Sequence, residues 1–289
     1  MNVEVCRNFL LVKTKFPDEL SNGEYQFKDE HFKKYCTNGC NNPLEKINAG
    51  CLYFFDEFFG TSSVFQSVAK NNINIVDYII IWLSYMLSLK KNQSNEILSY
   101  FYKIYINGGN KYKTPITGVD GYYSNYNDII NKKIDLTKVD MRIISKLYDA
   151  FITLCNMYSD YNENTSNCTK CSQKAIKFVE QYEELKKDST ITNNNSYNQL
   201  LSTLLNDYNN LKNICSDTSS FPLIEKAQTS EVISSSSIAN NLLIVLSIFG
   251  AISIFLGISY KYSLFGFWKR FKKQQIREKI KNIKKKMNQ

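Results

Sequence analysis

Eight cysteines are the residues of this sequence best suited to covalent chemistry. All of them precede a long apolar segment near the C-terminus, and an even count favours disulfides formed in an oxidising compartment. We therefore predict that most of them are disulfide-bonded. The pairing stays open, because eight cysteines allow about 105 connectivities. The candidates are Cys6, Cys36, Cys40, Cys51, Cys155, Cys168, Cys171 and Cys215.

Zinc binding is the competing interpretation of the cysteines. The pair Cys36 and Cys40 and the pair Cys168 and Cys171 could together supply four thiolates. However, the separation between the two pairs is far larger than in ordinary zinc ribbons. The single histidine, His31, has charged neighbours typical of a solvated helix face. We expect no metal and no cofactor.

Catalytic motifs are missing from the chain. It contains no G-x-x-x-x-G-K-[ST] loop, no G-x-S-x-G and no H-E-x-x-H. A Ser–His or Cys–His pair could involve only His31. The acidic pairs Asp56–Glu57 and Glu183–Glu184 are adjacent in sequence, so their side chains point in different directions on a helix. We expect neither an enzyme nor a small-molecule substrate.

Apolar residues recur at helical spacing through the first 215 residues. The i, i+3, i+4, i+7 pattern predicts helices over 44–59, 76–87, 97–106, 144–158, 174–186 and 196–211. Thr137 with Asp140, and Ser196 with Gln199, have spacings close to a capping box and predict helix starts. These patterns predict an all-α domain.

A segment rich in Gly, Asn and Tyr, residues 107–127, interrupts the helical pattern. We expect a surface loop there. An exposed loop is also a candidate recognition surface, because binding residues concentrate on loops. The ligand-contact residues remain unknown at this level.

Residues 238–260 contain no charged side chain. The apolar run 242–260 would span roughly 28 Å as a helix, close to the ~30 Å hydrocarbon core of a bilayer. Aromatic side chains gather at its C-terminal end, as in an interfacial belt. The segment predicts a transmembrane helix. No cleavable signal precedes it, so this helix would also act as the targeting signal.

The positive charge of the chain belongs to its last 29 residues. The net charge is +9, but eleven lysines and arginines follow Tyr260, with Glu278 as the only acid. The remaining residues are almost neutral, so nucleic acid is not an expected partner. The positive-inside rule predicts a cytoplasmic tail, 261–289, and an extracytoplasmic N-terminal domain. The expected membrane-interface residues are Trp268, Lys269, Arg270, Phe271, Lys272 and Lys273.

The sequence therefore divides into four parts. We expect a helical cysteine-containing ectodomain over 1–215 and a serine-rich flexible stalk over 216–237. The transmembrane helix, 238–260, and the basic tail, 261–289, complete the chain. The lipid bilayer is thus its first expected partner.

Several blocks of the sequence resemble the Plasmodium interspersed repeat (PIR) proteins, a variant multigene family of malaria parasites. The blocks are 47–59, 76–87, 148–155 and 196–204, and the end of the chain from Ser247 into the Lys-rich tail is similar as well. Members from rodent malaria parasites are the most similar. The resemblance implies a helical cysteine-containing domain, one C-terminal membrane helix and export toward the infected erythrocyte. It transfers no catalytic residue.

Two functions compete on these grounds. The resemblance implies a variant surface antigen whose ectodomain meets host receptors or antibodies and supports immune evasion. The alternative is a structural membrane protein that organises parasite-derived or host membranes through its basic tail. Exposure of the ectodomain on the infected cell discriminates the two.

Overall fold

The computed structural model describes residues 1–90, 96–133, 143–161, 165–188 and 195–216, together with Phe221, Pro222 and Ile224. All of these belong to one compact unit, Met1–Glu225. Within these ranges the regular structure is helical, and an isolated bridge joins Ser21 to Glu24. The helical class predicted from the sequence is confirmed for this part of the chain.

The described helices vary in length from one turn to about five turns. In chain order they are α1 (Val3–Lys15), η1 (Glu30–Tyr35), α2 (Pro43–Phe59), α3 (Ser62–Ser67), α4 (Ile75–Ser88), α5 (Ile97–Phe101), η2 (Tyr102–Ile106), α6 (Asn110–Lys113), α7 (Tyr126–Lys133), α8 (Ile144–Asp160), η5 (Thr169–Cys171), α9 (Ser172–Lys187) and α10 (Asn195–Ile214). Each of the six predicted helices is present. The predicted helix over 97–106 changes from α-helical to π-helical geometry after Phe101.

Helix α2 begins at a strong local start signal. The Asn42 side chain caps the helix by accepting a hydrogen bond from the Glu45 backbone N–H at 2.9 Å. Pro43 occupies the first helical position, where its missing N–H has no cost. Glu45 in the first turn completes the arrangement, because its carboxylate accepts from the backbone N–H of Asn41 at 3.1 Å.

The predicted start of the last helix is wrong in detail. Ser196 lies inside α10, which already includes Asn195. The Gln199 side-chain amide donates to Asp77 of α4 at 3.1 Å, so this residue ties the first turns of α10 to a buried carboxylate on another helix. The other predicted start, at Thr137 and Asp140, lies outside the described residues.

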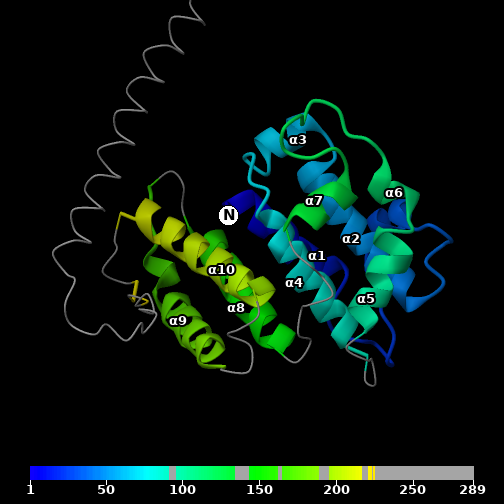
Figure 1. Cartoon of the computed structure of the whole chain (residues 1–289). Coiled ribbons are helices and arrows are strands. Elements are labelled where there is room, and N and C mark those ends of the chain that lie inside the picture. Colours follow the sequence, from blue (N-terminus) through cyan, green and yellow to red (C-terminus); the bar gives the residue numbers. More distant parts are fainter. Residues whose placement is uncertain are drawn as a thin grey trace, which may run out of the picture. The chain divides into compact units, whose positions relative to one another are not determined.

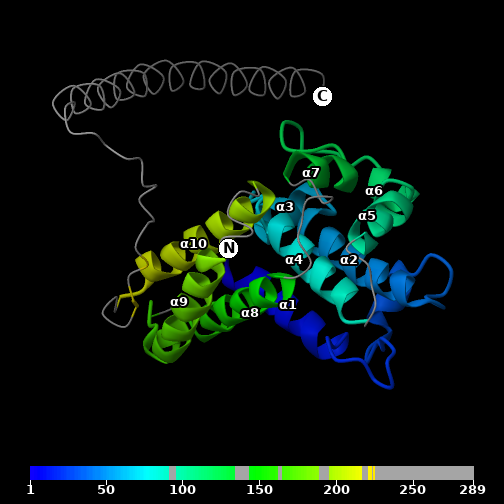
Figure 2. The same ribbon diagram turned by 60° about the horizontal axis from the view of Figure 1, so that its bottom comes forward.

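The helices form two neighbouring groups joined by α1 and α4 (Figures 1 and 2). Helices α8, α9 and α10 lie together on one side, while α2, α3, α5, α6 and α7 lie on the other. Aromatic rings fill the contact between the groups. Phe9 of α1 stacks on Phe54 of α2 at 4.3 Å between centroids and meets Phe151 of α8 edge-on at 4.7 Å.

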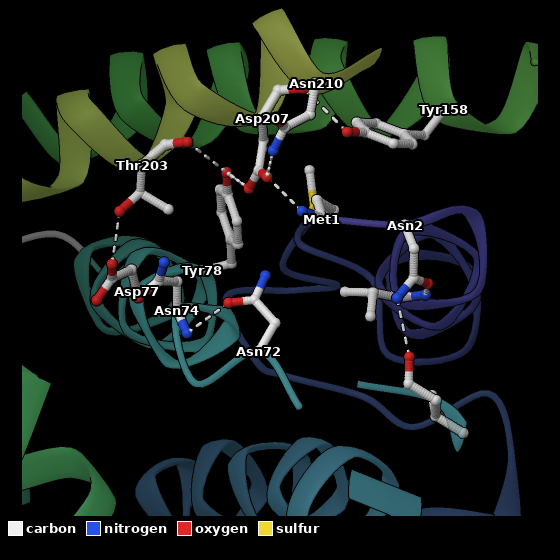
Figure 3. Close-up of polar contacts among 12 residues, drawn as sticks. Met1, Asn2, Asn72, Asn74, Asp77, Tyr78, Tyr158, Thr203, Asp207 and Asn210 are labelled. Atoms are coloured by element: carbon white, nitrogen blue, oxygen red, sulfur yellow. Dashed lines mark hydrogen bonds and ion pairs between the residues drawn. The ribbon is translucent and has the colours of Figure 1, made fainter. Parts of the chain in front are cut away.

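Buried polar side chains tie α4 to α10 within the core (Figure 3). Asp77 accepts from the Thr203 hydroxyl at 2.6 Å, and Tyr78 donates to the Asp207 carboxylate at 2.7 Å. Asp207 also pairs with the amine of Met1. Because each of these groups has a partner, the network adds specific positions to an otherwise apolar contact.

Candidate functional site

The structure pairs four of the eight cysteines. Cys36 bonds Cys40 beside the start of α2, with Cα atoms 5.1 Å apart. Cys168 bonds Cys215 and so joins the approach to α9 to the end of α10, with Cα atoms 5.7 Å apart. By loop entropy, closing this 47-residue separation stabilises the fold by about 4 kcal/mol.

The other four candidates differ from the sequence-based expectation. Cys6, Cys51, Cys155 and Cys171 are free thiols, and all are buried. They occupy core positions on α1, α2, α8 and η5, where a thiol packs as a small apolar side chain. Burial raises the pKa of Cys51 to about 12 and that of Cys171 to about 11, so both stay protonated.

The zinc interpretation loses its ligands in this arrangement. Cys36 and Cys40 are bonded to each other and Cys168 is bonded to Cys215, so three of the four proposed thiolates are oxidised. Among the described residues no three His, Cys, Asp or Glu side chains gather as a metal site. His31 is exposed on η1 and packs edge-on to Tyr53 at 6.0 Å between centroids.

The predicted loop 107–127 is largely a loop and runs over the α2 side of the molecule. After the single turn of α6 it passes α3 and enters α7 at Tyr126 (Figure 1). Tyr123 fixes it in place by donating its hydroxyl to the Phe59 carbonyl at 2.9 Å and packing on Phe65. Gly118 has φ +77° and lies against Ser62, so the chain turns sharply there.

Two adjoining hollows lie between this loop and α2. The larger, of about 520 Å³, is lined by α2, the start of α3, residues 111–117 and Tyr126. The smaller, of about 420 Å³, is lined by α2, residues 104–112 and residues 37–38. They share Leu52 and Lys111, so they meet at these two residues. We call the pair the α2 groove.

Four α2 residues at spacings of three and four form the floor of the α2 groove. Glu45, Asn48, Leu52 and Asp56 fall on one face of the helix. That stripe extends over about 17 Å, from the 1.5 Å rise per residue. The spacing was visible in the sequence, but the apolar face of the same helix dominated its pattern.

Asp56 provides the negative charge of the larger hollow. It is exposed, and its carboxylate accepts the Tyr35 hydroxyl at 2.6 Å. Burial, and then the hydrogen bond to Asp56, raise the pKa of Tyr35, and burial and the same carboxylate raise the pKa of Tyr126. Both phenols therefore stay protonated as donors. Within the described chain no Lys or Arg lies within 4.0 Å of Asp56.

Asn48 provides an unused donor in the smaller hollow. Its side chain is 3% exposed, and its carbonyl oxygen accepts the Tyr112 hydroxyl at 2.8 Å. Its amide nitrogen has no hydrogen-bond partner among the described residues. Lys111, at the junction, donates only to the Tyr35 carbonyl, at 3.1 Å. The α2 groove thus combines a carboxylate without a basic partner, a free amide donor and a cation with apolar walls, which suits ligand binding.

The predicted stalk, membrane helix and tail fall almost wholly outside the described residues. This applies to 238–260 and to the interface residues Trp268, Lys269, Arg270, Phe271, Lys272 and Lys273. Among the helices that the structure does describe, none has the length and apolarity needed to cross a bilayer.

The described residues form a helical, disulfide-bridged domain with an open polar groove along α2. Comparison with known proteins specifies the family. Residues 6–261 match the family described as "Plasmodium variant antigen protein Cir/Yir/Bir". The chain therefore belongs to this variant antigen family, and the PIR resemblance of its sequence blocks is confirmed.

A solved structure supports the same assignment. The chain is similar to the structure titled "Structure of a Plasmodium PIR protein ectodomain", with 28% identity and a TM-score of 0.58. The similarity covers 79% of this chain and 98% of that one. Comparison with curated proteins finds no match.

Proposed function

We propose that this chain is a single-pass membrane variant surface antigen whose helical ectodomain meets host molecules on the infected erythrocyte. The observation that carries the proposal is the match of residues 6–261 to a variant antigen family. Similarity of the helical part to a PIR ectodomain supports exposure of that part. The apolar segment 238–260 and the basic tail that follows supply the anchor and the orientation.

Contact with the host is the working step of this function. The domain offers the α2 groove and the loop 107–127 as recognition surfaces, and two disulfides fit it for an oxidising exterior. Immune evasion follows if the surfaces that antibodies and receptors bind differ between family members.

Surface proteolysis tests the exposure. Lys226 lies in the predicted stalk, so trypsin added to intact infected cells should release the N-terminal domain, carrying a tag at its N-terminus. The Lys226→Gln variant serves as the matched control and should be released more slowly. Protection in intact cells, with cleavage only after permeabilisation, would contradict the proposal.

A host-protein array tests the contact. The recombinant ectodomain should retain a small set of host surface proteins, and reduction of its disulfides should abolish that retention. Binding that is indifferent to reduction would point to nonspecific adhesion.

A further inference from the structure

The α2 groove has features that select for one class of ligand. Its larger hollow, about 520 Å³, falls within the range of about 300–1,000 Å³ typical of small-ligand pockets. Its floor is a straight stripe, from Glu45 to Asp56, rather than a closed bowl. An extended peptide rises about 3.3 Å per residue, so about five residues span such a stripe.

Asp56 determines what enters the larger hollow. The Tyr35 hydroxyl occupies part of its acceptor capacity, but a carboxylate has about four lone-pair sites. A planar guanidinium can use the remaining ones in a two-point contact. The rings of Tyr35 and Tyr126 line the same hollow, and the Tyr35 ring already has the Lys34 ammonium over it at 4.7 Å from its centroid.

Asn48 and Lys111 determine what lies beside that cation. The Asn48 amide nitrogen is an almost buried donor without a partner, and the Lys111 ammonium has two N–H groups beyond its bond to Tyr35. Both call for hydrogen-bond acceptors. Backbone carbonyls of an extended peptide supply such acceptors.

We propose that the α2 groove binds an extended segment of a partner protein, with an arginine side chain against Asp56 and neighbouring backbone carbonyls facing Lys111 and Asn48. The inference rests on the proposed role in host contact and adds the ligand class and the residues. Glu45 does not take part as a charge partner, because Asn38 and the Asn41 backbone already hold its carboxylate.

The test uses the full-length protein in phosphatidylcholine nanodiscs and two small probes. N-acetyl-arginine N-methylamide carries the guanidinium and two carbonyls, and its citrulline counterpart is the uncharged match. Saturation-transfer NMR should show the arginine side-chain methylenes in contact with the protein. The citrulline probe and the Asp56→Asn variant should each bind about five- to tenfold more weakly. Glu96→Gln, at an exposed acid outside both the α2 groove and the loop 107–127, should leave binding unchanged.

A second variant keeps the test decisive if Asp56→Asn does not fold. Thr117 is an exposed residue at the rim of the larger hollow, and Thr117→Arg should place a competing cation there and weaken binding. Absence of any arginine signal, equal signals from citrulline, or binding unchanged in both variants would overturn the inference. Asp56-dependent signals from N-acetylglucosamine in place of arginine would also overturn it and assign the groove to a glycan.

The failure of this inference is distinguishable from failure of the proposed function. If the host-protein array shows the same retention for wild type and Asp56→Asn, host contact stands and lies elsewhere on the domain. If the ectodomain is not exposed on intact cells, the proposed function fails whatever the groove binds.

Discussion

Single residues of this domain differ sharply in how far the fold controls their chemistry. Four cysteines are bridged and four are enclosed, although their sequence neighbourhoods do not separate them. Asp56 and Glu57 are adjacent acids, yet Asp56 faces the α2 groove, while burial raises the pKa of Glu57. The surroundings of each of these side chains, rather than its residue type, therefore determine its bonding and its pKa.

The free thiols should be inert in the folded protein. Burial raises the pKa of Cys6 well above its usual range, with Cys155 as its hydrogen-bonding neighbour, and the thiolate is the reactive form. We expect iodoacetamide to label no cysteine natively and four cysteines after unfolding without reductant. Mass spectrometry should then find Cys36–Cys40 and Cys168–Cys215 as the surviving disulfides. Eight labelled cysteines, or a third disulfide, would contradict the assignment.

Asp77 should make the folded state less favourable as pH rises. Desolvation raises its native pKa despite Lys133 at 3.6 Å, so the native state holds this proton more tightly than the unfolded chain does. The stability of the wild type relative to Asp77→Asn should therefore fall from about pH 4 upward, and level off above the native pKa. Denaturant unfolding of both proteins at several pH values measures this difference in stability.

Asp29 provides a control of opposite sign for this pH dependence. Its native pKa is lowered, chiefly by the hydrogen bond from the His31 backbone N–H. The wild type should gain stability over Asp29→Asn as pH rises from acid values. The same slope for both variants would show that a global charge effect, not the two sites, governs the pH dependence.

At the scale of elements, α2 serves two roles with its two faces. Gly50, Cys51, Phe54 and Phe55 face the core, and the stripe from Glu45 to Asp56 faces the α2 groove. Tight packing of the first face holds the second in place. Helices α3, α6 and α7 then cover the groove from the side without contributing much core of their own.

Gly50 should not tolerate even a methyl group. A Cβ there would lie 2.6 Å from the Trp82 ring and 3.1 Å from the Phe16 ring. Alanine improves helix propensity by about 1 kcal/mol, but overpacking should cost about 1–3 kcal/mol and dominate. Gly50→Ala should therefore lower the free energy of unfolding, measured with denaturant.

Replacing Trp82 with phenylalanine, whose ring is smaller, should relieve this clash. The double variant Gly50→Ala/Trp82→Phe should be more stable than the sum of the two single changes indicates, with a coupling of about 0.5 kcal/mol or more. Strict additivity would show that the Gly50 position relaxes in another way.

At the scale of the whole molecule, the anchor is the part of the proposal that sequence alone supports. We expect truncation after Ser237 to release the protein from membranes, since 238–260 is the only uncharged segment of that length. Carbonate extraction of cells expressing full-length and truncated chains measures it. A truncated chain that stays in the membrane pellet would show a second attachment.

The helical class, six of the helices and the family could all be predicted from the sequence. Amphipathic spacing is a local signal, and α2, α4, α8 and α10 carry strong apolar stripes that any compact fold must bury. The short helices α3, α6 and α7 were not predicted, because one or two turns contain too few residues to show a helical spacing of apolar side chains. Helix α1 was not predicted either, because its apolar run is brief and flanked by charges.

Three features follow only from contacts in the folded domain: the cysteine pairing, the hydrogen bond from Gln199 to Asp77 and the α2 groove. Cys168 and Cys215 are far apart in sequence and meet because α9 and α10 pack side by side. The Gln199 amide turns to Asp77 because α4 and α10 touch there. Asn48 and Asp56 share a groove with Lys111 because the loop 107–127 folds back over α2. Each result depends on contacts between distant segments, which no local pattern encodes.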